Sequence, residues 1–274
     1  MKIAGVVVLY NSPLSCLENI NTYINQVDIL FAIDNSDRIN ELLVETLKNT
    51  PKVEYVSNFG NQGISHALNR AAERAVQAGY SFLLTMDDDS SASANMIVEM
   101  KKFIAEYPSP DRIGIVGAAH SPATLQIGLP NPVLYTMTSG NLLNLRAYQD
   151  VGPFREDFFI DHVDHEYNLR LNSAGYAVIE LPSVRLNHPL GEKKRQWGIA
   201  YISHHPVRQY YIVRNGLLVA RQYLRRYPGV VYKMANLIVK EWIKVFFEQK
   251  DRRKRMGLML KGLKDGLLGR TGKL

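Results

Sequence analysis

Three adjacent carboxylates, Asp87, Asp88 and Asp89, follow the apolar residues 82–86. Adjacent like charges repel and raise each other's pKa, so the end of a buried strand is a costly place for them. Two carboxylates spaced i, i+2 can both approach one hard divalent cation, because such cations prefer oxygen ligands. A bound cation would offset the repulsion and would also neutralise a diphosphate leaving group. An acidic turn or helix cap explains the same triplet, so the residues alone leave both interpretations open.

A second acidic cluster lies in the segment FFIDHVDHEYNLRL, residues 158–171. If its second half is helical, Asp164 lies near the helix start, and Glu166 and Arg170 are four residues apart on one face, which suits an ion pair. Either Asp161 or Asp164, at a loop-to-helix junction, has the position of a general base for a sugar hydroxyl. Acids that interact with the helix dipole, beside a surface Glu166–Arg170 pair, explain the same residues. Residue types alone favour this second, structural interpretation.

A third polar segment, NFGNQG at residues 58–63, precedes a helical pattern at residues 64–78. Gly60 and Gly63 permit close approach of a ligand to the backbone, and the start of a helix can bind an anion. The segment matches neither the P-loop pattern GxxxxGK[ST] nor the dinucleotide pattern GxGxxG. The glycines alone therefore indicate a turn.

Alternating strands and helices must position these three segments. Apolar runs of strand length lie at residues 3–9, 29–33, 53–56, 80–86 and 113–119, and helical patterns lie between them. This order predicts an α/β fold, with a mostly parallel sheet and helices on both faces. Ligands of such sheets bind at the carboxyl ends of the strands, where Asp34, Asn58 and the aspartate triplet lie. Further on, we expect a helix at residues 162–175, a strand at 176–181 and mainly helices from residue 206.

Composition limits the remaining functions. The chain has 274 residues, 46% of them hydrophobic, as is typical of a globular protein. Its single cysteine, Cys16, excludes an internal disulfide and a multi-cysteine metal site, and fits a reducing, cytoplasmic setting. The net charge of +7 lies in residues 250–274, which hold nine Lys or Arg and two Asp. The rest of the chain is electrically neutral, so we expect no nucleic-acid partner.

The basic segment has its own pattern. We expect no signal peptide, and no apolar run approaches the roughly 18 residues that span a bilayer. Residues 230–249 have the pattern of an amphipathic helix, which either packs on the rest of the chain or lies on a membrane. Residues 251–270 have an apolar stripe among Lys and Arg, formed by Met256, Met259, Leu260, Leu263 and Leu267. This stripe predicts peripheral attachment to an anionic membrane, at the inner face of the plasma membrane.

Taken together, the motifs resemble the family 2 glycosyltransferases of GT-A fold, and most closely the bacterial rhamnosyltransferase-type members. The resemblance covers residues 2–225, with the motifs in the family's order. It rests on VVVLYN (6–11), AIDNSD (32–37), NFGNQGISHALNRA (58–71), TMDDDS (85–90), SGNLL (139–143), FFIDHVDHEYNLRL (158–171), LNHPLG (186–191) and RQYYIVRN (208–215). It implies a Rossmann-like catalytic domain at residues 1–225 and a basic, amphipathic helical extension at residues 226–274.

The resemblance also implies roles for single residues. Those on the nucleotide-sugar side would be Leu9, Tyr10, Asn11, Asp34, Asn58, Gly63, Asn69, Asp87, Asp88, Ser139, Gly140 and Arg170. Asp87 and Asp89 would hold Mg²⁺ or Mn²⁺ on the diphosphate, with His188 nearby. Asp164, six residues before Arg170, would be the catalytic base. The family's usual acidic pair reads Val163-Asp164 here, so the choice between Asp161 and Asp164 stays open, and Asp88 could shift the metal ligands by one residue.

The expected activity is that of a metal-dependent, inverting, hexosyltransferase-type enzyme. The resemblance implies transfer of L-rhamnose from dTDP-L-rhamnose to a saccharide or lipid-linked saccharide in bacterial surface polysaccharide synthesis. A nucleotidyltransferase could use a similar sheet and acidic metal site, but the first strand lacks the expected basic, glycine-rich signature. A non-catalytic scaffold of a membrane-surface assembly complex is a third possibility, which the two sets of carboxylates disfavour.

Overall fold

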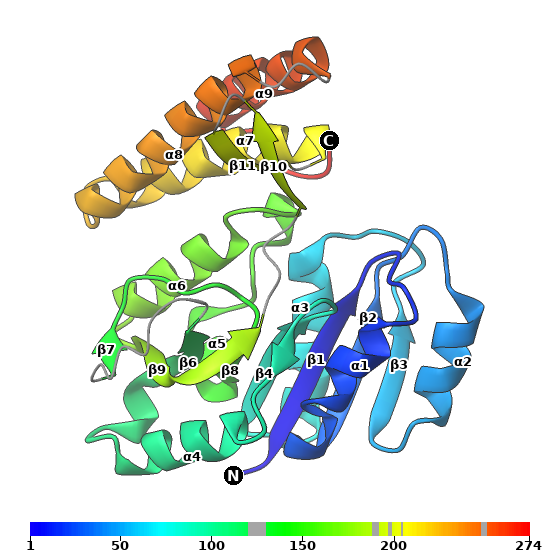
Figure 1. The fold of residues 1–274 in the computed structure, drawn as a ribbon. Coiled ribbons are helices and arrows are strands. Elements are labelled where there is room, and N and C mark those ends of the chain that lie inside the picture. Colours follow the sequence, from blue (N-terminus) through cyan, green and yellow to red (C-terminus); the bar gives the residue numbers. More distant parts are fainter. Residues whose placement is uncertain (120–129, 188–191, 197–198, 204, 248–250) are drawn as a thin grey trace. The chain divides into compact units, whose positions relative to one another are not determined.

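The structure is a computed structural model, and it describes residues 1–119, 130–187, 192–196, 199–203, 205–247 and 251–274. The chain forms two compact units (Figure 1). Unit 1 comprises Met1–Phe154 and Tyr167–Pro189, and unit 2 comprises Arg155–Glu166 and Leu190–Leu274. The division at residue 225 that the family resemblance implies remains a prediction.

Unit 1 is built on one sheet. Its strands are β1 (Ile3–Leu9), β2 (Ile29–Asp34), β3 (Val53–Ser57), β4 (Phe82–Asp87), β5 (Ser91–Ala92), β6 (Ile113–Ala119), β7 (Asn131–Pro132), β8 (Asn141–Asn144) and β9 (Ala177–Asn187). Their order is β3-β2-β1-β4-β8-β6-β9-β5, and β7 pairs with β9. The pairs among β1 to β4 are parallel, whereas β8 runs antiparallel to both β4 and β6. The predicted mostly parallel α/β sheet is confirmed.

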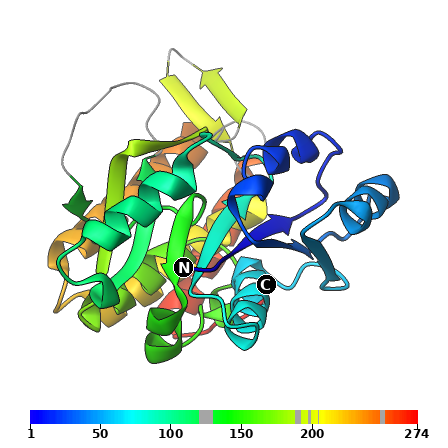
Figure 2. The same ribbon diagram turned by 90° about the horizontal axis from the view of Figure 1, so that it is seen from below.

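The helices of unit 1 cover both faces of this sheet. They are α1 (Cys16–Asn21), α2 (Glu41–Asn49), α3 (Ile64–Gln77), α4 (Met96–Glu106), α5 (Leu145–Val151) and the second part of α6 (Val163–Ser173). In Figure 1, α1 lies in front of β1 and α3 lies behind the sheet, and both views place α2 beside β3 at the sheet edge (Figure 2). Helix α3 approaches the strands closely because Ala67, Ala71 and Ala75, four residues apart, are fully buried.

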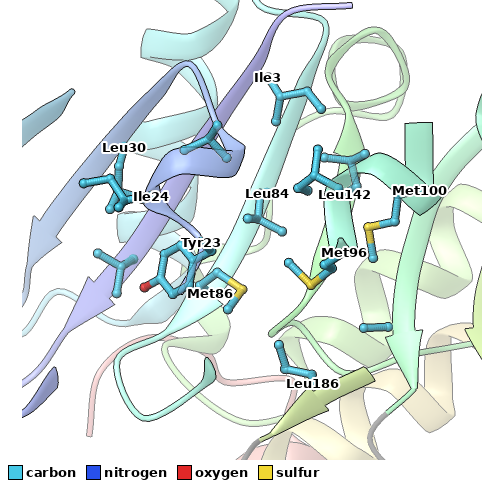
Figure 3. Close-up of a cluster of buried hydrophobic side chains, with 14 of the residues drawn as sticks. Ile3, Tyr23, Ile24, Leu30, Leu84, Met86, Met96, Met100, Leu142 and Leu186 are labelled. Carbon is cyan, nitrogen blue, oxygen red and sulfur yellow. The ribbon is translucent and has the colours of Figure 1, made fainter. Parts of the chain in front are cut away.

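The main core of unit 1 lies between the sheet and the helices α1 and α4. Figure 3 shows Leu84 and Met86 from β4 beside Tyr23, Met96 and Met100, all buried. Met side chains are flexible and fill irregular gaps where helices of different tilt meet a twisted sheet. This core fixes the ends of β1, β2 and β4, on which the polar residues of interest lie.

Strand β9 is longer than the sequence pattern predicts. The apolar pattern ends at residue 181, but the strand continues to Asn187. Its pairing with β6 shifts between Ala118 and Ala119, whose partners are Leu181 and Arg185. Such an irregularity accommodates Pro182, which has no N–H for a regular ladder.

Unit 2 holds the β10–β11 hairpin and three long helices. The elements are β10 (Glu192–Gln196), β11 (Ile199–Ser203), α7 (Pro206–Tyr223), α8 (Pro228–Phe247) and α9 (Arg252–Leu267), as expected for a helical end of the chain. Helices α7 and α9 pack closely through glycines. A Cβ at Gly262 would lie 2.5 Å from the carbonyl oxygen of Tyr210, and one at Gly266 would lie 3.0 Å from that of Arg214.

This packing divides the apolar stripe that the sequence predicts in residues 251–270. Met259 is fully buried in the unit and Met256 is half-buried, whereas Leu260, Leu263 and Leu267 are exposed. Helix α9 is therefore anchored on α7 by one side and is not a free amphipathic segment. Within the described ranges, no helix is both long enough and apolar enough to cross a bilayer.

Candidate functional site

The predicted polar residues meet at the carboxyl ends of β1 to β4. Leu9 is paired in register with Asp34, Asp34 with Ser57, and Val8 with Asp87. Parallel pairing therefore brings the ends of four strands to one edge, although the paired residues are 23 to 79 positions apart in the chain.

Asp34 lies at the centre of this edge, with 4% of its surface exposed. Its carboxylate accepts hydrogen bonds from the backbone N–H of Ser36, at 2.8 Å, and from the hydroxyl of Tyr55, at 2.8 Å. Burial, together with this carboxylate, raises the pKa of Tyr55, so the phenol remains a donor. These two donors fix the carboxylate, which can then accept an N–H from a planar base.

Asp37 connects two loops at this edge. Its carboxylate accepts from the Tyr10 hydroxyl, at 3.0 Å, and from the backbone N–H of Asn61, at 3.2 Å. Each loop carries an exposed aromatic ring, since Tyr10 is 49% exposed and Phe59 is 91% exposed. Sequence analysis missed Asp37 as a functional candidate, although it is the last residue of the motif AIDNSD. Asp37 thus holds the Tyr10 ring and the turn at Asn61, and an exposed aromatic ring at the strand ends fits a site for a planar ligand.

The remaining residues of these loops form a buried amide network. Asn35 donates from its side chain to the carbonyl oxygen of Gly63, at 2.9 Å, and accepts from the amide of Asn58, at 2.6 Å. Gly63 has a φ of 91°, which glycine adopts without strain, and α3 begins immediately after it. Asn11 also has a positive φ, and its backbone N–H donates to the Ser36 hydroxyl at 2.7 Å. Asn58 and Gly63 thus fix the position of Asn35 at the carboxyl ends of the strands.

The three aspartates of the triplet differ in their contacts and exposure. The carboxylate of Asp88 accepts from the Ser12 hydroxyl, and its backbone carbonyl accepts from Asn19 at 2.9 Å. Burial, and the neighbouring charge of Asp89, raise the pKa of Asp88. Asp87 is half-buried and Asp89 is exposed. Asp88 is half-buried too, but its carboxylate is the one that Ser12 engages, and the choice of Asp87 and Asp89 as the ligand pair remains a prediction.

This pair supplies the donor set that Mg²⁺ and Mn²⁺ prefer, namely carboxylate oxygens at an accessible turn. The residues therefore fit a hard divalent cation. His188, the third expected ligand, lies outside the described residues. Among the residues that are described, no group of three or more His, Cys, Asp or Glu side chains converges as a metal site.

Ser139 and Gly140 support the triplet from the neighbouring strand. The Ser139 hydroxyl accepts from the backbone N–H of Asp87, at 3.1 Å, and donates to the Ser90 hydroxyl, at 2.8 Å. The backbone N–H of Gly140 donates to the carbonyl oxygen of Thr85, at 2.8 Å. Ser139 is 1% exposed, so it positions the acidic turn from inside the protein.

Two other expected residues lie in structural roles. The amide of Asn69 is buried against Phe154, donating to its carbonyl at 2.9 Å and accepting from its N–H at 2.8 Å. Arg170 donates to the carbonyl oxygens of Val151, at 3.0 Å, and Pro153, at 2.9 Å. Both side chains thus hold the segment around residues 151–154, and their roles toward the donor remain predictions.

Both candidate bases belong to unit 2, and each has a cationic partner. Asp161 is 9% exposed at its side chain and forms an ion pair with Arg208 at 2.5 Å. Asp164, near the start of α6 as predicted, is 23% exposed and lies 2.9 Å from Nδ1 of His165. Burial alone would raise the pKa of Asp164, but the charge and hydrogen bonds of His165 lower it to about 2. Asp164 is therefore ionised at neutral pH and is the more accessible of the two carboxylates.

Glu166 is buried, so the structural interpretation that places it at the surface is wrong. It is 1% exposed, and its carboxylate accepts from the Tyr223 hydroxyl at 3.2 Å. A shallow pocket of unit 1, lined by Met1, Tyr80 and Arg146 among others, lies at the amino ends of β1 and β4. None of the predicted site residues lines it.

Comparison with known proteins agrees with this arrangement. Residues 6–120 match the model of glycosyl transferase family 2. A curated relative, the dTDP-rhamnosyl transferase RfbF of Shigella flexneri, is 26% identical over 294 residues, covering 99% of this chain and 97% of the relative.

Solved structures share the fold. TarS of S. aureus superposes with a TM-score of 0.61 and 14% identity, over 96% of this chain and 49% of that structure. GalNAc-T7 with UDP, GalNAc and Mn²⁺ superposes with a TM-score of 0.64 and 14% identity, over 98% of this chain and 56% of that structure. The chain thus spans about half the length of both structures. TarS 1–349 of S. aureus with UDP-GlcNAc superposes with a TM-score of 0.56 and 14% identity, over 98% of this chain and 93% of that structure. Residues 6–120 therefore match glycosyl transferase family 2, and the chain has the GT-A fold of these solved glycosyltransferases.

Proposed function

We propose that this glycosyltransferase transfers a sugar from a nucleoside diphosphate donor to an acceptor hydroxyl, with inversion at the anomeric carbon. The observation that carries the proposal is the register around β1, which brings buried Asp34 and half-buried Asp87 to one edge. One acid is suited to a nucleobase N–H and the other to the metal of a diphosphate.

The donor that we propose is dTDP-L-rhamnose. The similarity to the dTDP-rhamnosyl transferase RfbF along the full chain supports this choice. The exposed ring of Tyr10, which Asp37 holds, suits a pyrimidine base, because such bases stack on aromatic side chains.

In the proposed reaction, Asp164 accepts the proton of the acceptor hydroxyl. At the same time, the oxygen of that hydroxyl forms the new bond to the anomeric carbon. The bond between that carbon and the diphosphate oxygen breaks, and its electron pair leaves with the nucleoside diphosphate. Asp87 and Asp89 would hold Mg²⁺ or Mn²⁺, which neutralises charge on the diphosphate. His165 keeps Asp164 ionised at neutral pH. A single displacement at one carbon inverts its configuration.

The acceptor that we propose is a saccharide or lipid-linked saccharide, used in bacterial surface polysaccharide synthesis. The enzyme would act in the cytoplasm, peripherally attached to the inner face of the plasma membrane by its basic C-terminal helices. The excess of exposed Lys and Arg in α9 supports attraction to anionic lipids. The match of residues 6–120 to glycosyl transferase family 2 disfavours the nucleotidyltransferase alternative.

Donor turnover tests the proposal. The purified chain would be incubated with a panel of nucleotide sugars, with Mn²⁺, Mg²⁺ or chelator, and release of nucleoside diphosphate would be measured. We expect metal-dependent release from dTDP-L-rhamnose, with and without a membrane extract as the acceptor source. The Asp89→Asn variant is the matched control, and its metal-dependent release of nucleoside diphosphate should be lost. Absence of both turnover and donor binding would instead favour the non-catalytic scaffold.

A further inference from the structure

Helix α8 has two separate apolar faces, of which one is already used within unit 2. Val230, Met234 and Val245 are at most 4% exposed, and Ile238 and Trp242 are half-buried against the cluster formed with α7 and α9. This face accounts for the attachment of α8 to the rest of the unit.

The second face of α8 is exposed. Its residues are spaced by three, four, four and three positions, which places them in one stripe along a helix. They are Tyr232, Ala235, Val239, Ile243 and Phe246, and we call them the α8 face. Tyr232 is 70% exposed, and the three large residues that follow are 53% to 55% exposed.

Such a stripe is not needed for folding, because the opposite side of the helix supplies the packing. Single exposed apolar residues are common on protein surfaces, but a contiguous exposed row marks an interaction site. The row follows one helix for most of its length, so it fits a flat, extended partner better than a small molecule.

The charges around the α8 face are of one sign. Lys233 and Lys240 are exposed beside it, and the guanidinium carbon of Arg252 lies 4.2 Å from the centroid of the Phe246 ring. The single acid of α8, Glu241, is 9% exposed and pairs with Lys244 at 2.9 Å. The surface next to the row is therefore cationic, which favours an anionic partner.

We propose that the α8 face binds the surface of a bilayer that contains anionic phospholipid. The apolar row would lie at the acyl boundary, and the neighbouring Lys and Arg would lie among the headgroups. This inference rests on the proposed function, because it names the surface through which the enzyme would meet a lipid-linked acceptor. It also moves the main apolar contact from α9, where sequence analysis placed it, to α8.

Vesicle flotation of the full chain tests this assignment. We expect the chain to float with vesicles of phosphatidylcholine and phosphatidylglycerol, and less with phosphatidylcholine alone or at high salt. The double variant Val239→Gln/Ile243→Gln should reduce vesicle binding roughly tenfold or more. Leu42→Gln, in unit 1, is the matched control, because Leu42 is 58% exposed.

Leu267→Gln, on α9, distinguishes a membrane contact of α9 from one of α8, since Leu267 is 65% exposed. The assignment to α8 is wrong if Leu267→Gln abolishes flotation while the α8 double variant retains it. It is also wrong if the full chain ignores anionic vesicles, or if the double variant only converts a dimer to a monomer, which would make a second copy the partner. Circular dichroism checks that each variant is folded.

A label gives a second readout that does not depend on the loss of binding. Cys16 is 2% exposed, so Ile243→Cys supplies a single accessible thiol among the described residues for an environment-sensitive dye. A blue shift on anionic vesicles is expected, and an unchanged spectrum contradicts insertion. Nucleoside diphosphate release without vesicles should be the same in the α8 double variant and the parent chain. Release that is absent from both, with vesicle binding retained, would contradict the proposed function and leave the membrane surface standing.

Discussion

Asn215, on α7, donates a hydrogen bond from its side-chain amide to the carbonyl oxygen of Asp161, at 2.9 Å, across 54 residues of chain. The same amide lies 2.8 Å from the carbonyl oxygen of Ile160. Phe159, Asp161 and His162 have φ values of 66°, 62° and 61°. Each left-handed, non-glycine residue costs on the order of 1 kcal/mol. Asn215 thus holds a strained backbone that carries one candidate base and leads to the other.

Arg214 supports the same loop. It is fully buried and donates to the carbonyl oxygens of Asp157, at 3.2 Å, and Phe158, at 3.0 Å. Its guanidinium also donates to the carbonyl of Gly272, whose own N–H donates to Asp157 at 2.7 Å. Residues after α9 therefore stabilise the loop that precedes α6, and both belong to unit 2.

Replacing Asn215 by Ala should slow sugar transfer without weakening donor binding. The substitution leaves buried carbonyls without a donor, which costs about 1–3 kcal/mol of stability, and frees the strained loop. We expect transfer to fall roughly tenfold or more, with dTDP affinity unchanged by calorimetry. Leu224→Ala, at the exposed end of α7, is the control. Full transfer activity in a folded Asn215→Ala protein would show that the loop does not depend on this amide.

The two candidate bases can be separated by amide substitutions. Asp164→Asn should lower transfer roughly 10²- to 10⁴-fold, because a general base contributes that much, while donor binding remains. Asp161→Asn should act mainly on stability, because Asp161 is the less exposed residue and Arg208 loses its partner. Transfer rates and dTDP affinities of both variants provide the measurement. A larger loss of transfer in Asp161→Asn would assign the base to Asp161.

The aspartate triplet predicts unequal effects on metal binding. Asp87→Asn and Asp89→Asn should each weaken Mn²⁺ binding in the presence of dTDP by roughly tenfold or more, because each removes a charged oxygen ligand. Asp88→Asn should leave Mn²⁺ binding nearly unchanged, since this carboxylate accepts from Ser12. Titration followed by electron paramagnetic resonance measures the three affinities. If Asp88→Asn has the largest effect, the ligand pair is shifted by one residue.

His162 should make the protein less stable in mild acid. Burial, followed by the charge of His165, lowers the pKa of His162 from 6.5 to about 4. Between these two values the unfolded chain binds a proton that the folded chain does not, so stability falls as the pH falls. The loss should be roughly 2 kcal/mol between pH 6.5 and pH 5.

Urea unfolding at these two pH values measures the loss, and His162→Asn is the test variant. Asn tolerates the left-handed backbone of this position and does not titrate, so its stability should vary less with pH. His165 affects stability in a different pH range. Asp164 raises its pKa, so the stability that His165 contributes is lost as the pH rises. An equal pH dependence in His162→Asn and the parent chain would exclude His162 as the source.

Asp37 should affect donor affinity more than stability. Asp37→Ala releases Tyr10 and the turn at Asn61, both at the surface, so the free energy of unfolding should change by less than about 1 kcal/mol. Affinity for dTDP should fall roughly five- to tenfold, because the Tyr10 ring would no longer be held in place. Calorimetry measures the affinity, with Asp111→Ala, at an exposed residue of unit 1, as the control. Unchanged dTDP binding would show that Asp37 plays no part in the nucleotide site.

Much of this description follows from local sequence patterns. The period of apolar residues predicted β1 to β4 and the helices between them, because burial on one or both faces is encoded within each element. The position of Asp34 and the triplet at strand ends followed from the same patterns. The start of α6 beside Asp164 and its end before Gly175, which has a φ of 81°, were also visible, because capping chemistry is local.

Other features depend on contacts between distant segments, and only the tertiary structure decided them. The Asp88 carboxylate accepts a hydrogen bond from Ser12, 76 residues away. Asn215 supports Asp161 because α7 and the loop before α6 belong to one compact unit. The sequence of α8 contains two apolar rows, and neither row alone reveals which one packs. The contacts with α7 and α9 bury the row of Val230 and Val245, and this leaves the row of Val239 and Ile243 exposed.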